Sequence, residues 1–219
     1  MERPSETLSR PPEEGARLLA LACLDEAAAA YPRLARSDDA AALHDFRVAL
    51  RRLRSCLRAY AGLLAGSLPG KLRRRLERLA RATGPGRDTE VQIEWLRQAM
   101  PALSKHQRAG HAWLLSRLER RRKEEHGELT AGLARRFTAL EADLRNRLSV
   151  YRAEIHLGEA PRPTFAFATA QVLAVQAADL ASHLAEIEGA GDQEEAHRAR
   201  ISAKRLRYLL DPVAAEVPQ

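Results

Sequence analysis

HDFRVALRRLRSCL at residues 44 to 57 recurs, without a gap, as HRARISAKRLRYLL at residues 197 to 210. The alignment pairs histidine with histidine, leucine with leucine and basic residues with basic residues: His44 with His197, Arg47 with Arg200, Arg51 with Lys204, Arg52 with Arg205, Arg54 with Arg207, Leu53 with Leu206 and Leu57 with Leu210. Each copy follows an apolar helical pattern, at 13 to 31 and at 164 to 188. This internal repeat predicts two related helical units.

The first copy predicts an amphipathic helix with a basic stripe beside an apolar arc. At about 100° per residue, the polar positions fall within an arc of roughly 80°; they are His44, Arg47, Arg51, Arg54 and Arg58. The adjacent arc carries the leucines at 43, 50, 53 and 57, together with Phe46 and Tyr60. Burial of the apolar arc should hold the stripe, about 21 Å long, at the rim of the packed interface.

The rest of the chain is typical of an all-α protein. Of its 219 residues, 45% are hydrophobic but only 5% are aromatic, and strand formers are scarce. Apolar spacing and turn signals predict helices near 13–31, 40–65, 70–83, 88–99, 104–156, 164–188 and 193–215. A turn is expected at 84–86, with Asp88 capping the next helix; the fifth helix is predicted as one, with two helices broken near Gly127 or Gly132 as the alternative.

Positive charge is concentrated around the first copy. Residues 44 to 87 hold 12 Lys and Arg against two acidic residues, within a net charge of +7 for the chain. The planar guanidinium group of arginine can donate two hydrogen bonds to phosphate oxygens, and it stays charged at any biological pH. Residues 71–78 are expected to extend this surface. The competing interpretation is that these basic residues lie on an ordinary solvated helix face. The presence of two aligned copies with few acidic residues argues against it.

Other functional classes find little support. We identify no Ser/His/Asp or Cys/His set, no phosphate-binding loop and no metal-ligand spacing, so no enzyme, cofactor or metal is expected. Cys23 and Cys56 are interpreted as small core residues. No signal peptide or run of 18 apolar residues is found, so a cytoplasmic location without a membrane span is expected.

These motifs, together with LxxxTGPGRDTEV at 79 to 91, resemble the CHAD family, the conserved histidine α-helical domains. The resemblance implies two pseudo-symmetric helical bundles around a basic channel that binds inorganic polyphosphate. The resemblance assigns polyphosphate binding to residues of both motif helices and to the arginine of the Arg87-Asp88 pair. These residues are His44, Arg47, Arg51, Arg52, Arg54, Arg58, Arg87, His197, Arg200, Lys204, Arg205 and Arg207.

The chain departs from the family pattern after the second motif. In the family, further helices there mirror residues 70 to 150, but this sequence ends at Gln219. The second bundle is therefore expected to be incomplete, with a partner chain as one way to cover its apolar face. The expected division is a disordered tail at 1–12, a first half at 13–157 and a truncated second half at 158–219.

The resulting hypothesis is a bacterial, non-enzymatic polyphosphate-binding module. Sulfate or phosphate could occupy the same site, and weak non-specific nucleic-acid binding is expected from any basic groove. The alternatives are a structural protein associated with polyphosphate or other storage granules and a generic nucleic-acid or phosphate binder. Homo-oligomerisation is left open by the sequence.

Overall fold

The computed structural model describes residues 4–35, 39, 41–150 and 163–214, with side chains throughout except at 4–5, 85–87, 125–131 and 134. The helices are α1 (Pro4–Ser9), α2 (Pro12–Ala30), η1 (Tyr31–Ala35), α3 (Ala42–Ala59), α4 (Gly70–Ala82), α5 (Gly84–Ala99), η2 (Met100–Ala102), α6 (Lys105–Ser149), α7 (Phe165–Ala185) and α8 (Gln193–Ala214). These ranges contain no strand, so the predicted all-α class is confirmed.

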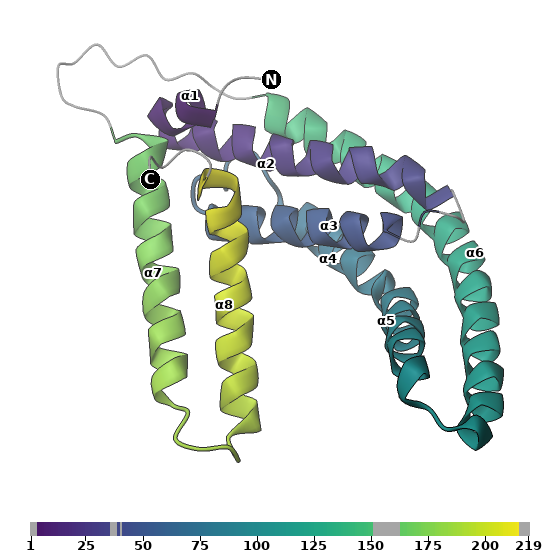
Figure 1. Ribbon diagram of the computed structural model, residues 1–219. Coiled ribbons are helices and arrows are strands. Elements are labelled where there is room, and N and C mark those ends of the chain that lie inside the picture. Colours follow the sequence, from purple (N-terminus) through teal and green to yellow (C-terminus); the bar gives the residue numbers. More distant parts are fainter. Residues whose placement is uncertain (1–3, 36–38, 40, 151–162, 215–219) are drawn as a thin grey trace, which may run out of the picture.

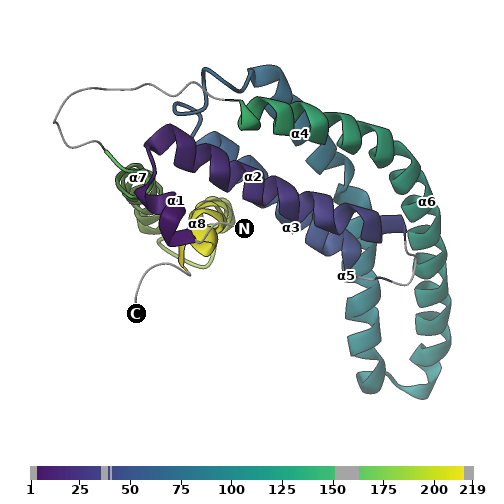
Figure 2. The ribbon, with the colours of Figure 1, turned by 90° about the horizontal axis from the view of Figure 1, so that it is seen from above.

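The helices form an arch with two legs (Figure 1). The upper part contains α2, α3, α4 and the C-terminal half of α6. One leg is the hairpin of α5 with the N-terminal half of α6, and the other is the hairpin of α7 with α8. Figure 2 shows this second leg end-on, beside α2. The predicted order of an apolar helix followed by a basic helix thus occurs twice, as α2–α3 and as α7–α8.

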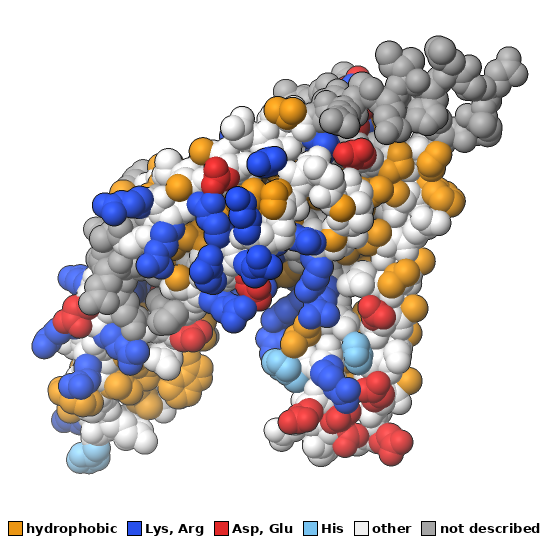
Figure 3. Space-filling model, turned by 180° about the vertical axis from the view of Figure 1, so that it is seen from behind, with side chains coloured by type: hydrophobic (Ala, Val, Ile, Leu, Met, Phe, Trp, Pro, Cys, Tyr) orange, Lys and Arg blue, Asp and Glu red, His pale blue; other side chains and the backbone are white. Residues whose placement is uncertain are grey.

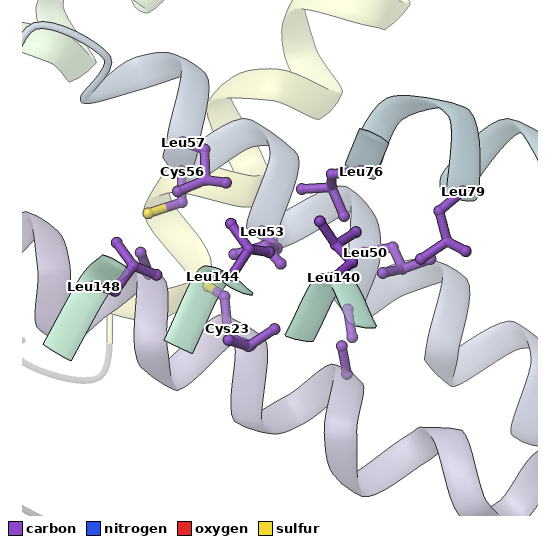
Figure 4. Close-up of a cluster of buried hydrophobic side chains, with 14 of the residues drawn as sticks. Cys23, Leu50, Leu53, Cys56, Leu57, Leu76, Leu79, Leu140, Leu144 and Leu148 are labelled. Atoms are coloured by element: carbon purple, nitrogen blue, oxygen red, sulfur yellow. The ribbon is translucent and has the colours of Figure 1, made fainter. Parts of the chain in front are cut away.

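The main core lies between α2, α3, α4 and α6 (Figure 4). Leu24, Leu50, Leu53 and Leu144 are 0% exposed. Full burial of one such side chain contributes about 1.5–3 kcal/mol. Both cysteines are free and buried, as predicted. Contact with Cys23 and burial raise the pKa of the Cys56 thiol, which keeps it protonated and unreactive.

The helix predicted at 40–65 ends early, at Ala59. A series of turns follows, because Gly62 and Gly66 are poor helix formers. Tyr60 begins these turns and is buried against Phe165 of α7, with ring centroids 5.0 Å apart. Its hydroxyl lies 3.1 Å from Thr169 Oγ1, and burial raises its pKa to about 12.

The predicted turn at 84–86 is instead the first turn of α5. Proline fits the start of a helix because its missing N–H would have no intrahelical acceptor there. Asp88 therefore lies inside the helix, and the prediction that it caps α5 is wrong. The fifth helix is continuous from Lys105 to Ser149, so the alternative of two helices broken near Gly127 or Gly132 is wrong.

Part of the expected disordered tail is folded. Residues 4–9 form α1, and the Arg10 carbonyl accepts a 2.8 Å hydrogen bond from the Phe165 amide at the start of α7. Buried Gly15 in α2 lies directly under the Phe165 ring, where a Cβ atom would overlap the ring. The N-terminal segment therefore anchors the second leg to α2.

The substitution Gly15→Ala tests whether helix propensity or packing against Phe165 has the larger effect on stability at this position. Propensity alone predicts stabilisation of about 1 kcal/mol. The overlap involves the Cβ and Cγ atoms of Phe165, which cannot move without displacing α7. Overpacking of this kind costs about 1–3 kcal/mol, so we expect a net loss of up to about 2 kcal/mol in the free energy of unfolding, measured by urea denaturation. Gly110→Ala, at an exposed helical glycine with open space around it, is the matched control and should stabilise the protein.

Arg17 joins α2 to the C-terminal end of α6. Its side chain is 3% exposed, and it donates hydrogen bonds to the carbonyls of Leu148 and Val150 and to the Ser67 hydroxyl. It also pairs with Glu13 at 3.1 Å. The last carbonyls of a helix have no intrahelical donors, so Arg17 supplies the partners that the end of α6 needs.

Three large apolar side chains of α7 are exposed. Phe167, Val175 and Leu184 are 56%, 60% and 54% exposed. By length and composition alone, α7 is the one helix in the described ranges that could cross a membrane, although helices of water-soluble bundles pass the same test. Its inner face packs on α8, where His183 Nδ1 lies 2.9 Å from Ser202 Oγ.

Candidate functional site

The basic stripe of α3 lies at the rim of the core, as its helical spacing predicts. Leu43, Phe46, Leu50, Leu53 and Leu57 are buried on the inner side of α3. His44 and Arg58 are exposed, and the three arginines between them on the stripe are half-buried. Burial of the leucines therefore fixes the position of the stripe.

The stripe of α8 meets that of α3 near the C-terminal ends of the two helices. Arg51 Nη1 lies 3.5 Å from the Tyr208 hydroxyl. Arg52 Nη2 lies 3.6 Å from an Asp211 carboxylate oxygen. The two helices cross here (Figure 1). The two stripes thus form one angled surface rather than two parallel rows.

Arg54, Arg58 and Arg205 form what we call the arginine cluster, at this crossing. Burial, and then the charges of Arg205 and Arg54, lower the pKa of Arg58. Neither Arg58 nor Arg205 forms an ion pair with a carboxylate of the described residues. Arg54 has one acidic neighbour, Glu77, at 3.7 Å. Glu77 also pairs with Arg81 at 2.6 Å, so one carboxylate serves two guanidinium groups.

A hollow of about 320 Å³ extends the cluster onto α4. This α3/α4 hollow is lined by Arg54 and Arg58 from α3 and by Arg73, Arg74 and Glu77 from α4. Residues 71–78 were predicted to extend the basic surface, but that prediction did not single out Arg73 and Arg74. The spacing of the leucines in α4 could have identified Arg73 and Arg74. Leucines 72, 76 and 79 share one buried face of the helix, which leaves Arg73 and Arg74 exposed.

In Figure 3, Lys and Arg side chains gather at the top of the gap between the two legs. Pale blue histidines lie lower on the leg formed by α7 and α8 and at the foot of the other leg. The basic surface therefore faces the space under the arch.

Arg47 and Arg52 of the predicted set bond to residues of neighbouring helices. Arg52 pairs with Glu26 of α2 at 2.9 Å as well as with Asp211, and these carboxylates raise its pKa. Arg47 donates a hydrogen bond to the Thr83 carbonyl at the junction of α4 and α5. Both side chains thus join α3 to neighbouring helices, and they are less available to a ligand than Arg58 or Arg205.

The predicted histidines lie at the far ends of the surface. His44 is in the first turn of α3, and His197 is eight residues before Arg205, about 12 Å along α8. Arg200 and Lys204 are exposed along this part of α8. The structure does not bring the two histidines together. Arg87 lies in the first turn of α5, and its side chain lies outside the described residues.

Tyr208 is held between two predicted site arginines. Burial alone would raise the pKa of its hydroxyl, but Arg51 and Arg207 outweigh burial and lower it. The Arg207 guanidinium lies 5.4 Å from the centroid of the Tyr208 ring. Tyr208 is 8% exposed, so its ring packs beneath the arginine side chains and has no exposed face on which a ligand could stack.

The fold and surface together define an all-α module with a basic face under an arch. The family model of the CHAD domain matches residues 18–217, so the chain belongs to the CHAD family. The crystal structure of the CHAD domain from the plant Ricinus communis has the same fold, with a TM-score of 0.74 and 20% sequence identity over 97% of this chain and 68% of that chain. No curated protein matches the sequence.

Proposed function

We propose that this protein binds inorganic polyphosphate on the basic surface formed by α3, α4 and α8. The observation that carries the proposal is the arginine cluster, in which three guanidinium groups lie together and no described carboxylate pairs with Arg58 or Arg205; partial burial, and then the like charges, lower the pKa of Arg58. Such an arrangement repels itself unless an anion neutralises it. A linear phosphate chain supplies closely spaced anions that fit guanidinium forks.

The proposed mechanism is passive binding. The core fixes helix α3 before the ligand arrives, so no backbone of the stripe has to be ordered on association. The phosphate chain exchanges its counterions for arginine and lysine side chains, which makes the affinity dependent on salt. Affinity should increase with chain length until the surface is filled, and no covalent step takes place.

Burial of the aromatic residues favours polyphosphate over nucleic acid. Proteins that bind single strands usually combine a basic groove with aromatic side chains on which bases stack. Phe46 and Tyr60 are 0% and 1% exposed, and Tyr208 is covered by Arg207. The basic surface therefore has cations for a phosphate backbone, but its nearby aromatic rings are not free to stack on bases.

Competition calorimetry tests this preference. Long-chain polyphosphate is compared with single- and double-stranded nucleic acid of matched charge at about 0.15 M salt, where exposed charges are strongly screened. We expect polyphosphate to bind at least about a hundredfold more tightly, because only its charge spacing lets several arginines bind bidentately at once. Equal affinities that all decline together with salt would show a generic basic surface and contradict the proposal.

A further inference from the structure

A second basic hollow, of about 470 Å³, lies between α4 and α6. This α4/α6 hollow is lined by Arg75 and Arg78 of α4, Arg136 of α6, and two leucines. The leucines, Leu79 and Leu140, are 4% and 2% exposed and belong to the main core (Figure 4). The hollow therefore has an apolar floor and a cationic rim.

The charges at this rim are unbalanced. Arg75 forms an ion pair with Asp143, the one acid partner found at the rim among the described residues. Arg78 and Arg136 reach the same hollow from different helices, and neither forms an ion pair with a described carboxylate. Like charges that share an apolar-floored hollow repel each other more strongly than in open water. An anion seated between them would remove this repulsion.

The α4/α6 hollow is separate from the α3/α4 hollow, since no residue lines both. The helical period of α4 explains the separation. Its buried leucines form a line that faces the core. Arg75 and Arg78 fall on the side of this line that faces α6, whereas Arg73 and Glu77 fall on the side that faces α3. Helix α4 thus stands between two basic hollows.

We propose that the α4/α6 hollow is a second binding site, specific for a single phosphate group. Guanidinium forks from two opposing helices can each donate two hydrogen bonds to one tetrahedral anion. Arg75, which Asp143 holds in place, supplies a further donor at the same rim. A phosphate group could come from a small free anion or from the end of a polyphosphate chain, and both present the same terminal oxygens.

The test uses the full chain with pyrophosphate as the probe. Arginine Nε–H resonances are followed by NMR during the titration, and those of Arg78 and Arg136 are expected to shift and saturate together. Arg78→Gln with Arg136→Gln should weaken the pyrophosphate affinity of this site at least about tenfold, since charged hydrogen bonds are lost. Arg108→Gln with Arg120→Gln removes the same charge from exposed positions on the other half of α6 and should change the affinity less than about twofold.

Two results would overturn the second site. One is that the Arg78 and Arg136 resonances shift no more than those of Arg108 and Arg120 at saturating pyrophosphate. The other is that the folded Arg78→Gln, Arg136→Gln variant keeps wild-type affinity. Neither result depends on the arginine cluster, so failure of this site and failure of the proposed function are distinguishable.

Polyphosphates of different lengths separate the two sources of the phosphate group. At constant total phosphate, occupancy that follows the number of chain ends supports capture of a terminal phosphate. Occupancy by pyrophosphate but not by long chains supports a site for small free anions. Shifts that follow total phosphate regardless of chain length would show diffuse attraction and overturn the single-phosphate site.

Discussion

Replacement of Arg58 and Arg205 together by alanine is expected to weaken long-chain polyphosphate binding at least about a hundredfold, because each charged hydrogen bond contributes about 1.5–3 kcal/mol. Neither side chain has an acidic partner in the described part of the protein, so their removal leaves no carboxylate unpaired. The variant should therefore fold as the wild type does. Calorimetry gives the affinity, and urea denaturation gives the free energy of unfolding.

Controls for this prediction come from the same chain. Arg108→Ala with Arg120→Ala removes two charges from exposed positions of α6 and should leave the affinity within about twofold, because distant exposed charges are screened. Arg51→Ala with Arg54→Ala should have an intermediate effect of about tenfold. These two arginines also contact Tyr208 and Glu77, which compete with the ligand. Wild-type affinity in a folded Arg58→Ala, Arg205→Ala variant would refute the proposed site.

Arg17→Ala should destabilise the protein by about 3 kcal/mol without a direct effect on the basic surface. The substitution removes the donors to the carbonyls of Leu148 and Val150 and to the Ser67 hydroxyl. The bond to the Leu148 carbonyl is the buried one of the three, and a buried polar atom left without a partner costs about 1–3 kcal/mol. Truncation also leaves a cavity where the 3% exposed side chain packs. Urea denaturation measures the loss.

Arg145→Ala is the matched control, because Arg145 also joins α6 to α2. It pairs with Asp25 at 2.8 Å, but its side chain is 43% exposed and that of Asp25 is 62% exposed. Exposed ion pairs typically contribute about 0.2–1 kcal/mol. If Arg17→Ala lost no more stability than Arg145→Ala, burial of Arg17 at the end of α6 would not be what stabilises this junction.

The spacing of apolar residues along the sequence was sufficient to predict most of the helices and the basic stripe. The period of 3.6 residues determines which side chains share a face, and every leucine of the predicted apolar arc of α3 is buried. Family membership was also recognisable from the motifs, since residue identities carry it. The duplication itself stays a prediction, supported by the repeated order of an apolar helix and a basic helix.

The errors at helix ends have local causes that compete with the period. Gly62 and Gly66 end the helical region after Ala59, although apolar spacing continues past them. The Gly84–Gly86 segment has the composition of a turn, yet proline and glycine are both tolerated in the first turn of a helix, where α5 begins. The apolar period does not record these preferences of glycine and proline at helix ends.

The amino-acid pattern alone predicts an all-α chain with two basic helical faces. Helix packing is what brings Arg58 beside Arg205, pairs Arg52 with Glu26 and Asp211, and places Arg78 and Arg136 at one hollow. The physical reason is that helical period fixes the faces of each helix but not which helices pack together, or at what angle. Those depend on how ridges and grooves of distant segments interlock.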